Sequence, residues 1–187
     1  MAITAGSYTL GPGDGTLSVR TKKAGAAAKA GHNLLIEVTS WSATLTVGDD
    51  DAPMSIELSA DSRSLKVLDG TGGMTSLGDD DKASIKQTID EQVLRGTAIE
   101  FRSTAVEGES NPAGGAQLRV SGELELAGWR NPIAFELTAA ADGHLAAVAI
   151  VKQSSWGIKP YAALFGTLKV IDEVTVEIAA RLPRAAN

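Results

Sequence analysis

The sequence predicts an all-β fold, a single antiparallel barrel with one α-helix. Apolar and polar residues alternate through successive segments between residues 97 and 183, and turn residues separate these segments. One segment, residues 79–95, has helical periodicity instead. The length of 187 residues fits one domain spanning 1–187, because a single barrel can reach this size without dividing.

The amino-terminal part is predicted to contain two strands, Tyr8–Leu10 and Thr16–Lys22. The glycine-rich turn Gly11–Gly15 separates them, so we expect a hairpin-like start. A phosphate-binding loop has a similar composition, but it requires a helix N-terminus directly after it, and here a strand follows.

The next segments have an apolar face whose parity changes once. The alternating apolar residues are Leu34, Ile36 and Val38, then, on the opposite parity, Trp41, Ala43, Leu45 and Val47. Because a shift of one residue turns every side chain to the other face, an extra residue must be absorbed near Thr39–Ser40. We therefore expect a bulge or sharp bend there.

The helix is predicted at about residues 79–95. Ile85, Ile89 and Val93 form a narrow apolar stripe, aspartates occupy the first turn, and Arg95 and Gly96 are typical of the last turn and C-cap. The stripe is expected to pack against the core near the barrel mouth. A role as a lid on that mouth is the second interpretation.

The carboxyl-terminal strands show the period-2 pattern of a sheet with one face in the core. The expected inward residues are Leu118, Val120, Gly122, Leu124, Leu126, Ile133, Phe135, Leu137, Ala139, Ala141, Leu145, Ala147, Ala149, Val151, Val174, Val176, Ile178, Ala180 and Leu182. The strands that carry Phe101, Leu124 and Phe135 should be neighbours, so that these residues and Leu137 form one apolar wall.

Composition excludes several classes of function. The net charge is −6 and the 17 basic residues are scattered along the sequence, so no nucleic-acid partner is expected. The absence of cysteine excludes disulfides and thiolate metal sites. The first residues do not resemble a signal peptide and no apolar run has the length of a membrane span, so we expect a soluble, cytoplasmic protein.

No catalytic constellation is present in the sequence. There are two histidines, no Gly-x-Ser-x-Gly motif and no metal-ligand spacing, so neither an enzyme nor a metal site is predicted. His144 lies in a turn and is expected to be solvated. His32 begins a strand beside Gly31, a residue that allows close approach of another group. A structural hydrogen bond and a ligand or head-group contact both remain open for His32.

The order of short motifs along nearly the whole chain resembles the YceI-like family of lipocalin-like, polyisoprenoid-binding domains. The motifs are Ser7–Leu10, Gly31–Leu34, Thr97–Ser103, Val120–Gly128, Asn131–Ile133, Gln153–Ile158 and Asp172–Val174. This resemblance implies an extended eight-stranded antiparallel lipocalin-like barrel whose apolar tunnel holds a long isoprenoid or other lipid chain. It implies no catalytic residues.

The chain departs from the family pattern at two places. Near the helix, Gln92–Arg95 stands where the family usually has a paired Phe-Phe. Gln153 stands where the family commonly has an arginine, and Ser155 replaces an acidic residue. If the family residues form an ion pair, this chain is expected to use neutral hydrogen bonds in its place.

Small inward residues such as Ala147 and Ala149 favour a cavity, because an eight-stranded barrel is either filled by side chains or left with room for one ligand. We therefore predict non-catalytic binding, sequestration or transport of a polyisoprenoid, isoprenoid quinone or fatty-acyl lipid, with no cofactor. The predicted ligand-binding residues are Phe101, Leu124, Phe135, Leu137, Ala149, Val151, Trp156, Ile85, Ile89 and His32.

The alternative is a structural or protein-interaction module with a fully packed barrel and functional surface loops. Such loops are Ser103–Gly114 and Lys22–Ala30, and Lys22–Ala30 has three lysines among small residues in an acidic protein. Lys22–Ala30 is either a solvated loop or a contact for a phosphate head group or an acidic partner. A homodimer is also left open by the sequence.

Overall fold

A computed structural model of the chain describes residues 5–48, 54–110 and 115–182, with the side chains of residues 109 and 110 left out. Within them, one large antiparallel sheet has the strand order β1-β5-β6-β8-β9-β10-β11-β14-β2-β4-β7. Its strands are β1 (Gly6–Leu10), β2 (Gly15–Arg20), β4 (Asn33–Val38), β5 (Trp41–Val47), β6 (Ser55–Ala60), β7 (Leu65–Thr71), β8 (Ile99–Ser110), β9 (Ala116–Leu126), β10 (Trp129–Ala139), β11 (His144–Lys152) and β14 (Glu173–Arg181).

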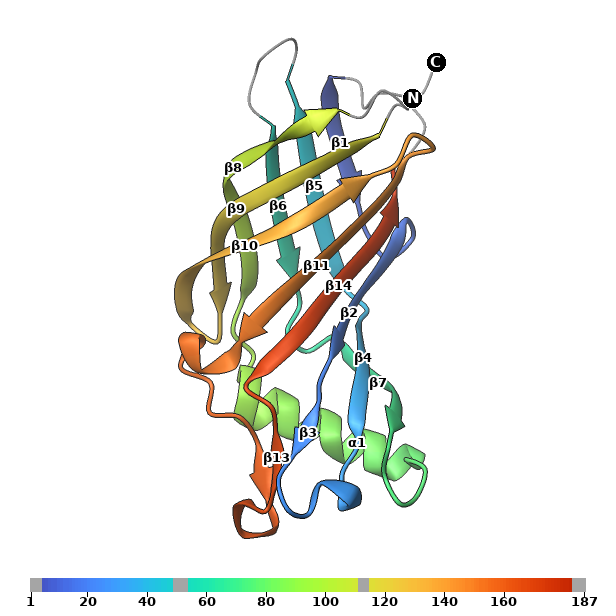
Figure 1. Cartoon of the computed structure of the whole chain (residues 1–187), viewed down its shortest axis with the longest axis vertical. Helices are drawn as coiled ribbons and strands as arrows, with labels where there is room; N and C mark the ends of the chain where they lie inside the picture. Colours follow the sequence, from blue (N-terminus) through green and yellow to red (C-terminus); the bar gives the residue numbers. More distant parts are fainter. Residues whose placement is uncertain (1–4, 49–53, 111–114, 183–187) are drawn as a thin grey trace.

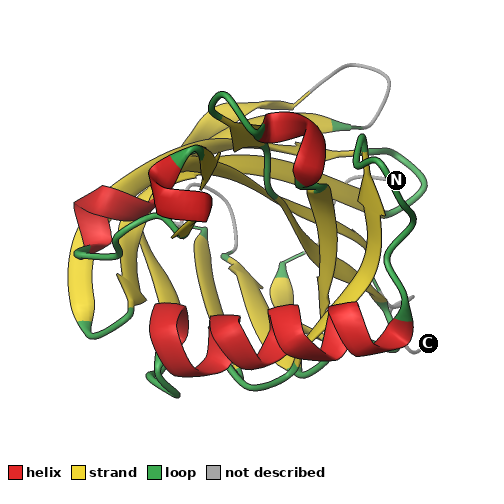
Figure 2. Ribbon diagram, turned by 90° about the horizontal axis from the view of Figure 1, so that it is seen from below, coloured by secondary structure: helices red, strands yellow, loops and turns green. Residues whose placement is uncertain are grey.

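The described strands form eight long segments, three of which are interrupted. β1 and β2 pair with β5 and β4, which are the two halves of the next segment, and β5 and β4 pair in turn with β6 and β7. β14 pairs with β11 on one side and with β2 on the other. Each segment therefore has two neighbours and the sheet curls into a barrel (Figures 1 and 2). The predicted eight-stranded antiparallel barrel is confirmed in this sense.

The predicted hairpin at the amino terminus is wrong. Gly11 and Asp14 do form a turn, in which the Asp14 amide donates to the Gly11 carbonyl at 2.9 Å. However, β1 and β2 do not pair with each other, because β1 pairs with β5 and β2 with β4 and β14. The turn interrupts one long strand, because its two halves pair with the two halves of the neighbouring bent segment.

The bend predicted at Thr39–Ser40 is confirmed, because β4 ends at Val38 and β5 begins at Trp41. The neighbouring segment breaks at the same level. The Thr39 amide and hydroxyl both donate to the Ser64 carbonyl, at 3.1 and 2.8 Å, and the Asp61 amide donates to the Ser40 carbonyl at 3.0 Å. The bend at Thr39–Ser40 and the break between β6 and β7 thus provide hydrogen-bond partners for each other's backbone groups.

The helix α1 (Asp79–Thr88) continues as a wider π-helical turn, η2 (Ile89–Leu94), so the helical segment ends one residue before the predicted end. Arg95 and Gly96 both take the left-handed conformation after the helical segment, with φ 55° and 67°. The helix lies across the lower end of the barrel, at the end opposite the two termini (Figure 1).

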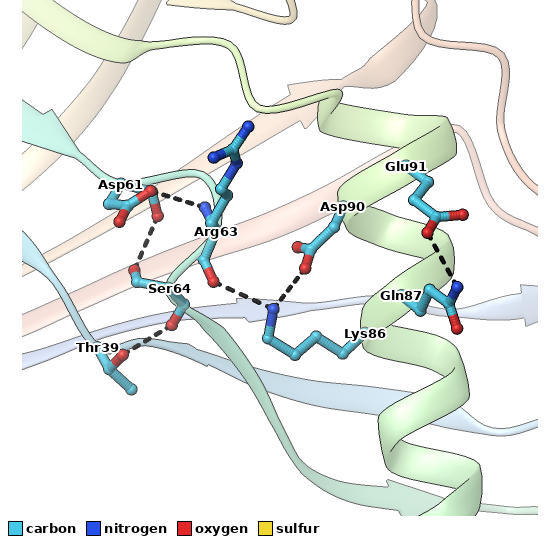
Figure 3. A network of polar contacts seen from close by, with 8 residues as sticks. All are labelled: Thr39, Asp61, Arg63, Ser64, Lys86, Gln87, Asp90 and Glu91. Carbon is cyan, nitrogen blue, oxygen red and sulfur yellow. Dashed lines mark hydrogen bonds and ion pairs between the residues drawn. The ribbon is translucent and has the colours of Figure 1, made fainter.

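One hydrogen-bonded network joins the helix to the bend (Figure 3). The ammonium of Lys86 donates to the Arg63 carbonyl at 3.1 Å and pairs with Asp90 one turn later in the helix. Asp61 in turn accepts from the Arg63 amide at 2.8 Å. The helix is therefore attached to the bend between β6 and β7 by a polar contact as well as by its apolar stripe.

A small second sheet, β12-β13-β3, extends below the barrel. Its strands are β3 (Lys23–Ala24), β12 (Ala162–Ala163) and β13 (Leu168–Val170), and the short helical turns η1 (Ala28–Ala30) and η4 (Leu164–Gly166) flank it. No segment of this sheet shows enough alternation to be read as a strand from sequence. A third short turn, η3 (Gln153–Trp156), contacts β10. Residues 103–110, expected in a surface loop, are strand residues of β8, and the rest of that expected loop lies outside the described residues.

Candidate functional site

A cavity of about 500 Å³ lies inside the barrel, and its lining is almost entirely apolar. All the long strand segments contribute inward side chains to it, and the helix contributes Ile85, Ile89 and Val93. The interior is therefore not filled by side chains, which is the condition for an eight-stranded barrel to accept one ligand.

The upper limit of the cavity is set by packed side chains. Leu137 and Leu145 line it, whereas Leu118, Val120 and Ala139 are buried, with exposed fractions of 6, 0 and 2 %, and do not. At the lower end the lining includes Tyr161 and Lys169, which are exposed. The cavity is thus closed by core packing above and reaches the surface at the helix end.

Nine of the ten residues predicted to bind a ligand line this cavity. They are Phe101, Leu124, Phe135, Leu137, Ala149, Val151, Ile85, Ile89 and His32. Phe101 lies opposite Leu124 in the β8–β9 register, and its ring contacts that of Phe135 with 5.4 Å between centroids. The expectation that β8, β9 and β10 are neighbours with one apolar wall is confirmed, and contact with a ligand stays a prediction.

Gly122 makes room for this wall. It lies on β9 with the inward parity, and a Cβ atom there would stand 2.6 Å from the ring of Phe101 and 2.4 Å from the Arg102 carbonyl. A larger residue at position 122 would clash with both, so glycine leaves the space that the Phe101 ring occupies.

Trp156 does not line the cavity, in contrast to the prediction. Its side chain is buried, 3 % exposed, in a separate cluster with Val151 and Ile158. Its indole Nε1 donates to the Leu124 carbonyl at 2.8 Å. Trp156 packs against lining residues such as Leu124 and Val176, so it supports the lining without itself facing the cavity.

His32 has a hydrogen-bond partner and also reaches the cavity. Its Nε2 lies 2.6 Å from the Thr75 carbonyl, and the ring packs so close to Gly73 that a Cβ atom there would lie 2.0 Å from Nε2. Gly31 allows close approach as the sequence suggested, because the side chain of Leu168 occupies the place of its missing Cβ. The histidine therefore fixes the β7–α1 loop at the lower rim.

Gln153 places a neutral polar group in the lining. It is 8 % exposed, and its Nε2 donates to the carbonyls of Ile171 and Asp172 at 3.1 and 3.3 Å. Gln153 therefore forms neutral hydrogen bonds at this position, as expected. The Ser154 hydroxyl donates to the Asp172 carboxylate at 2.5 Å, and this bond holds the pKa of Asp172 below its usual range.

Several lower-rim residues were missed by sequence reasoning. Lys23, Tyr161, Leu168 and Val170 line the cavity, but they lie in short strands and turns that lack periodicity. The apolar residues around Tyr161 were the only sequence signal for this part of the lining. They do not alternate, so they do not indicate which side chains face the barrel interior.

Within the ranges that the structure describes, no group of three His, Cys, Asp or Glu side chains is placed to hold a metal ion. His144 pairs with Asp142 in an exposed turn, at 2.8 Å. That hydrogen bond lowers the pKa of Asp142. Among the described helices, none combines the length and the apolar character that crossing a membrane requires.

A curled antiparallel barrel around an apolar cavity that opens at one end defines a binding-barrel class of protein. The chain belongs to the family of YceI-like domains, whose family model matches residues 8–182. No curated protein matches it.

Two solved structures share this fold. Burkholderia cenocepacia BcnA is 18 % identical, with a TM-score of 0.61, over 88 % of this chain and 94 % of its own. A polyisoprenoid binding domain from Saccharophagus degradans, described as implicated in plant cell wall breakdown, is 11 % identical, with a TM-score of 0.59, over 96 % of this chain and 100 % of its own. At these identities the likeness establishes the fold alone.

Proposed function

We propose that the chain binds a long apolar ligand, a polyisoprenoid, an isoprenoid quinone or a fatty-acyl lipid, inside the barrel and carries it without chemical change. The cavity of about 500 Å³ carries this proposal. A packed barrel, which the alternative interaction module requires, leaves no such space. The polyisoprenoid-binding description of the Saccharophagus degradans domain agrees with the proposal.

The shape of the cavity favours a tail-first orientation. Apolar side chains close the upper end, and most of the polar lining residues, among them Lys23, His32 and Gln153, belong to segments at or near the lower end. A ligand with one polar end therefore keeps that end near water while the chain lies between Phe101, Phe135 and Ala149. Each buried CH₂ group contributes about 0.8 kcal/mol before the loss of chain freedom, so affinity should rise with chain length until the cavity is full.

The test is lipid extraction and native mass spectrometry of protein purified without detergent, followed by titration with isoprenoid alcohols of increasing length. We expect a co-purified lipid or a complex with added isoprenoid, and tighter binding of longer chains up to a plateau. Protein that is repeatedly empty and ignores every added isoprenoid and fatty acid contradicts the proposal. The cytoplasmic location stays a prediction and is checked by cell fractionation.

A further inference from the structure

Two segments far apart in the sequence meet below the barrel and form a basic, apolar tip. We define the tip as residues 21–31 and 157–171, which include β3, β12 and β13. Lys169 lies opposite Ala24 in the small sheet, and the Ala27 amide donates to the Thr167 carbonyl at 2.9 Å. The loop before β13 is the lowest part of the molecule in Figure 1.

The tip carries five lysines and no aspartate or glutamate, although the whole chain has a net charge of −6. The lysines are Lys22, Lys23, Lys29, Lys159 and Lys169. Four of them are exposed, and none of the five forms an ion pair with any other described residue. Lys23 donates to the carbonyls of Gly31 and Gly72, which leaves its charge uncompensated.

Large apolar side chains project from the same tip. Phe165 is 109 % exposed, Leu164 is 54 % exposed and Tyr161 is 43 % exposed. Leu164 and Phe165 both have positive φ, 49° and 55°, which is unfavourable for such residues. The Thr167 amide and hydroxyl close the loop by donating to the Leu164 carbonyl at 3.1 and 2.6 Å. The fold thus keeps the Phe165 ring fully exposed to solvent, although this requires a strained backbone at Leu164 and Phe165.

We propose that this tip docks on the surface of an anionic lipid bilayer, with Phe165 and Leu164 in the interface and the lysines on the lipid head groups. Interfacial binding requires exposed apolar and aromatic groups together with basic residues, and the tip has both. The acidic first turn of α1 lies at the other side of this end, and the tip extends past it (Figure 1).

The position of the tip connects docking with the cavity. Tyr161, Leu168, Lys169 and Val170 belong to the tip and also line the cavity. A lipid chain passing from a docked bilayer into the barrel therefore avoids bulk water. The passage of lipid from the bilayer into the cavity rests on the proposed function. Docking does not depend on it, and docking is measured on protein freed of lipid.

The experiment is co-sedimentation with vesicles of equal parts phosphatidylglycerol and phosphatidylcholine, compared with phosphatidylcholine alone, at low and high salt. We expect binding to the acidic vesicles that is lost at high salt. Phe165→Asn removes the ring and suits the left-handed backbone, and it should weaken binding about tenfold or more. Ile150→Thr, on the exposed outer face of β11, is the matched control and should bind like the original chain.

Charge is tested separately. Lys29→Gln with Lys159→Gln and Lys169→Gln should reduce the partition coefficient about a hundredfold, since each lysine near an anionic surface contributes about a factor of five. Lys66→Gln with Arg102→Gln and Arg119→Gln removes the same charge from the barrel wall and should have little effect. Equal losses in the two triple variants mean that only net charge matters, and this result overturns the proposal.

Insertion of the tip is measured with Phe165→Trp, whose fluorescence should shift to the blue and be quenched by brominated acyl chains. No binding to acidic vesicles at low salt contradicts the proposal, and binding to a polyglutamate chain in their place assigns the tip to an acidic protein partner. Vesicle binding by a protein that takes up no lipid leaves this inference standing and contradicts the proposed carrier function.

Discussion

At the scale of single residues, small side chains on inward positions decide whether the barrel is hollow. Ala147 and Ala149 lie on the inward parity of β11, between Leu145 and Val151, and all four line the cavity. Ala149 faces Val176 across the β11–β14 ladder. Its methyl group leaves space that a larger residue can occupy, so this position offers a direct test of the cavity.

Ala149→Phe should fill the cavity and abolish lipid retention, while thermal stability holds or rises because the ring occupies empty space. Ala146→Phe, on the exposed face of the same strand, is the control and should leave lipid retention unchanged. In a close-packed interior the Ala149 variant costs about 1–3 kcal/mol from overpacking. Melting curves and lipid extraction on the same samples distinguish these results, and a destabilised Ala149 variant that retains lipid normally contradicts the inward assignment.

Ser154→Ala should raise the pKa of Asp172, because the Ser154 hydroxyl is the main cause of the lowered value. A depressed carboxyl pKa means that folding favours the charged form. The stabilisation is therefore complete above the ordinary aspartate pKa and disappears as the pH falls through the lower value in the folded protein. The variant should be less stable at neutral pH and approach the original chain in strong acid. A carboxyl NMR titration of Asp172 that is unchanged by the substitution contradicts this account.

At the scale of elements, the helix is held to the barrel by two kinds of contact. Ile85 and Ile89 pack partly against the core, and Lys86 bridges from the helix to the Arg63 carbonyl between β6 and β7. The Lys86 ammonium forms an ion pair with Oδ2 of Asp90. The other carboxylate oxygen of Asp90, Oδ1, is buried and has no hydrogen-bond partner. Removing the ammonium leaves this half-buried carboxylate uncompensated.

Lys86→Met should lower stability by about 1–2 kcal/mol, since a hydrogen-bonded charge is lost and a partly buried carboxylate loses its counter-ion. The effect should be local, with faster hydrogen exchange in α1 and η2 and little change in β9 and β10. Gln87→Met, which breaks the exposed bond to Glu91 on the same helix, is the control and should cost much less. Uniform acceleration of exchange throughout the barrel is the result that this account does not allow.

At the scale of the whole molecule, the barrel is closed by long-range pairing. The carboxyl-terminal strand β14 pairs with β2 near the amino terminus, for example Val176 with Val19. Inward residues from nearly every strand belong to one core that surrounds the cavity. A ligand that fills the cavity therefore contacts most of the barrel at once and should stabilise the molecule as a unit.

Addition of a bound isoprenoid at about 100 times its Kd should raise the free energy of unfolding by about 2.7 kcal/mol, if it binds only the folded chain. The measurement is urea unfolding with and without ligand, followed by tryptophan fluorescence and circular dichroism. The two probes should shift together. A shift confined to one probe indicates that the ligand stabilises only part of the barrel.

Most inward-facing residues, the extent of the helix and the bend at Thr39–Ser40 are predictable from the amino-acid sequence. These features follow from local periodicity, because side chains of a strand alternate between two faces and those of a helix repeat every 3.6 residues. The same information supports the assignment of Phe101, Leu124 and Phe135 to one wall.

Which segments meet depends on long-range strand pairing and is not predictable from local patterns. Nothing local distinguishes a hairpin between β1 and β2 from one interrupted strand, because the difference lies in their pairing with β4 and β5. Trp156 is large and apolar like a lining residue, but in the structure it packs beneath residues that line the cavity and does not reach the cavity itself. The lysines of residues 21–31 and 157–171 are scattered in the sequence and form one surface because long-range strand pairing joins β3 to β13.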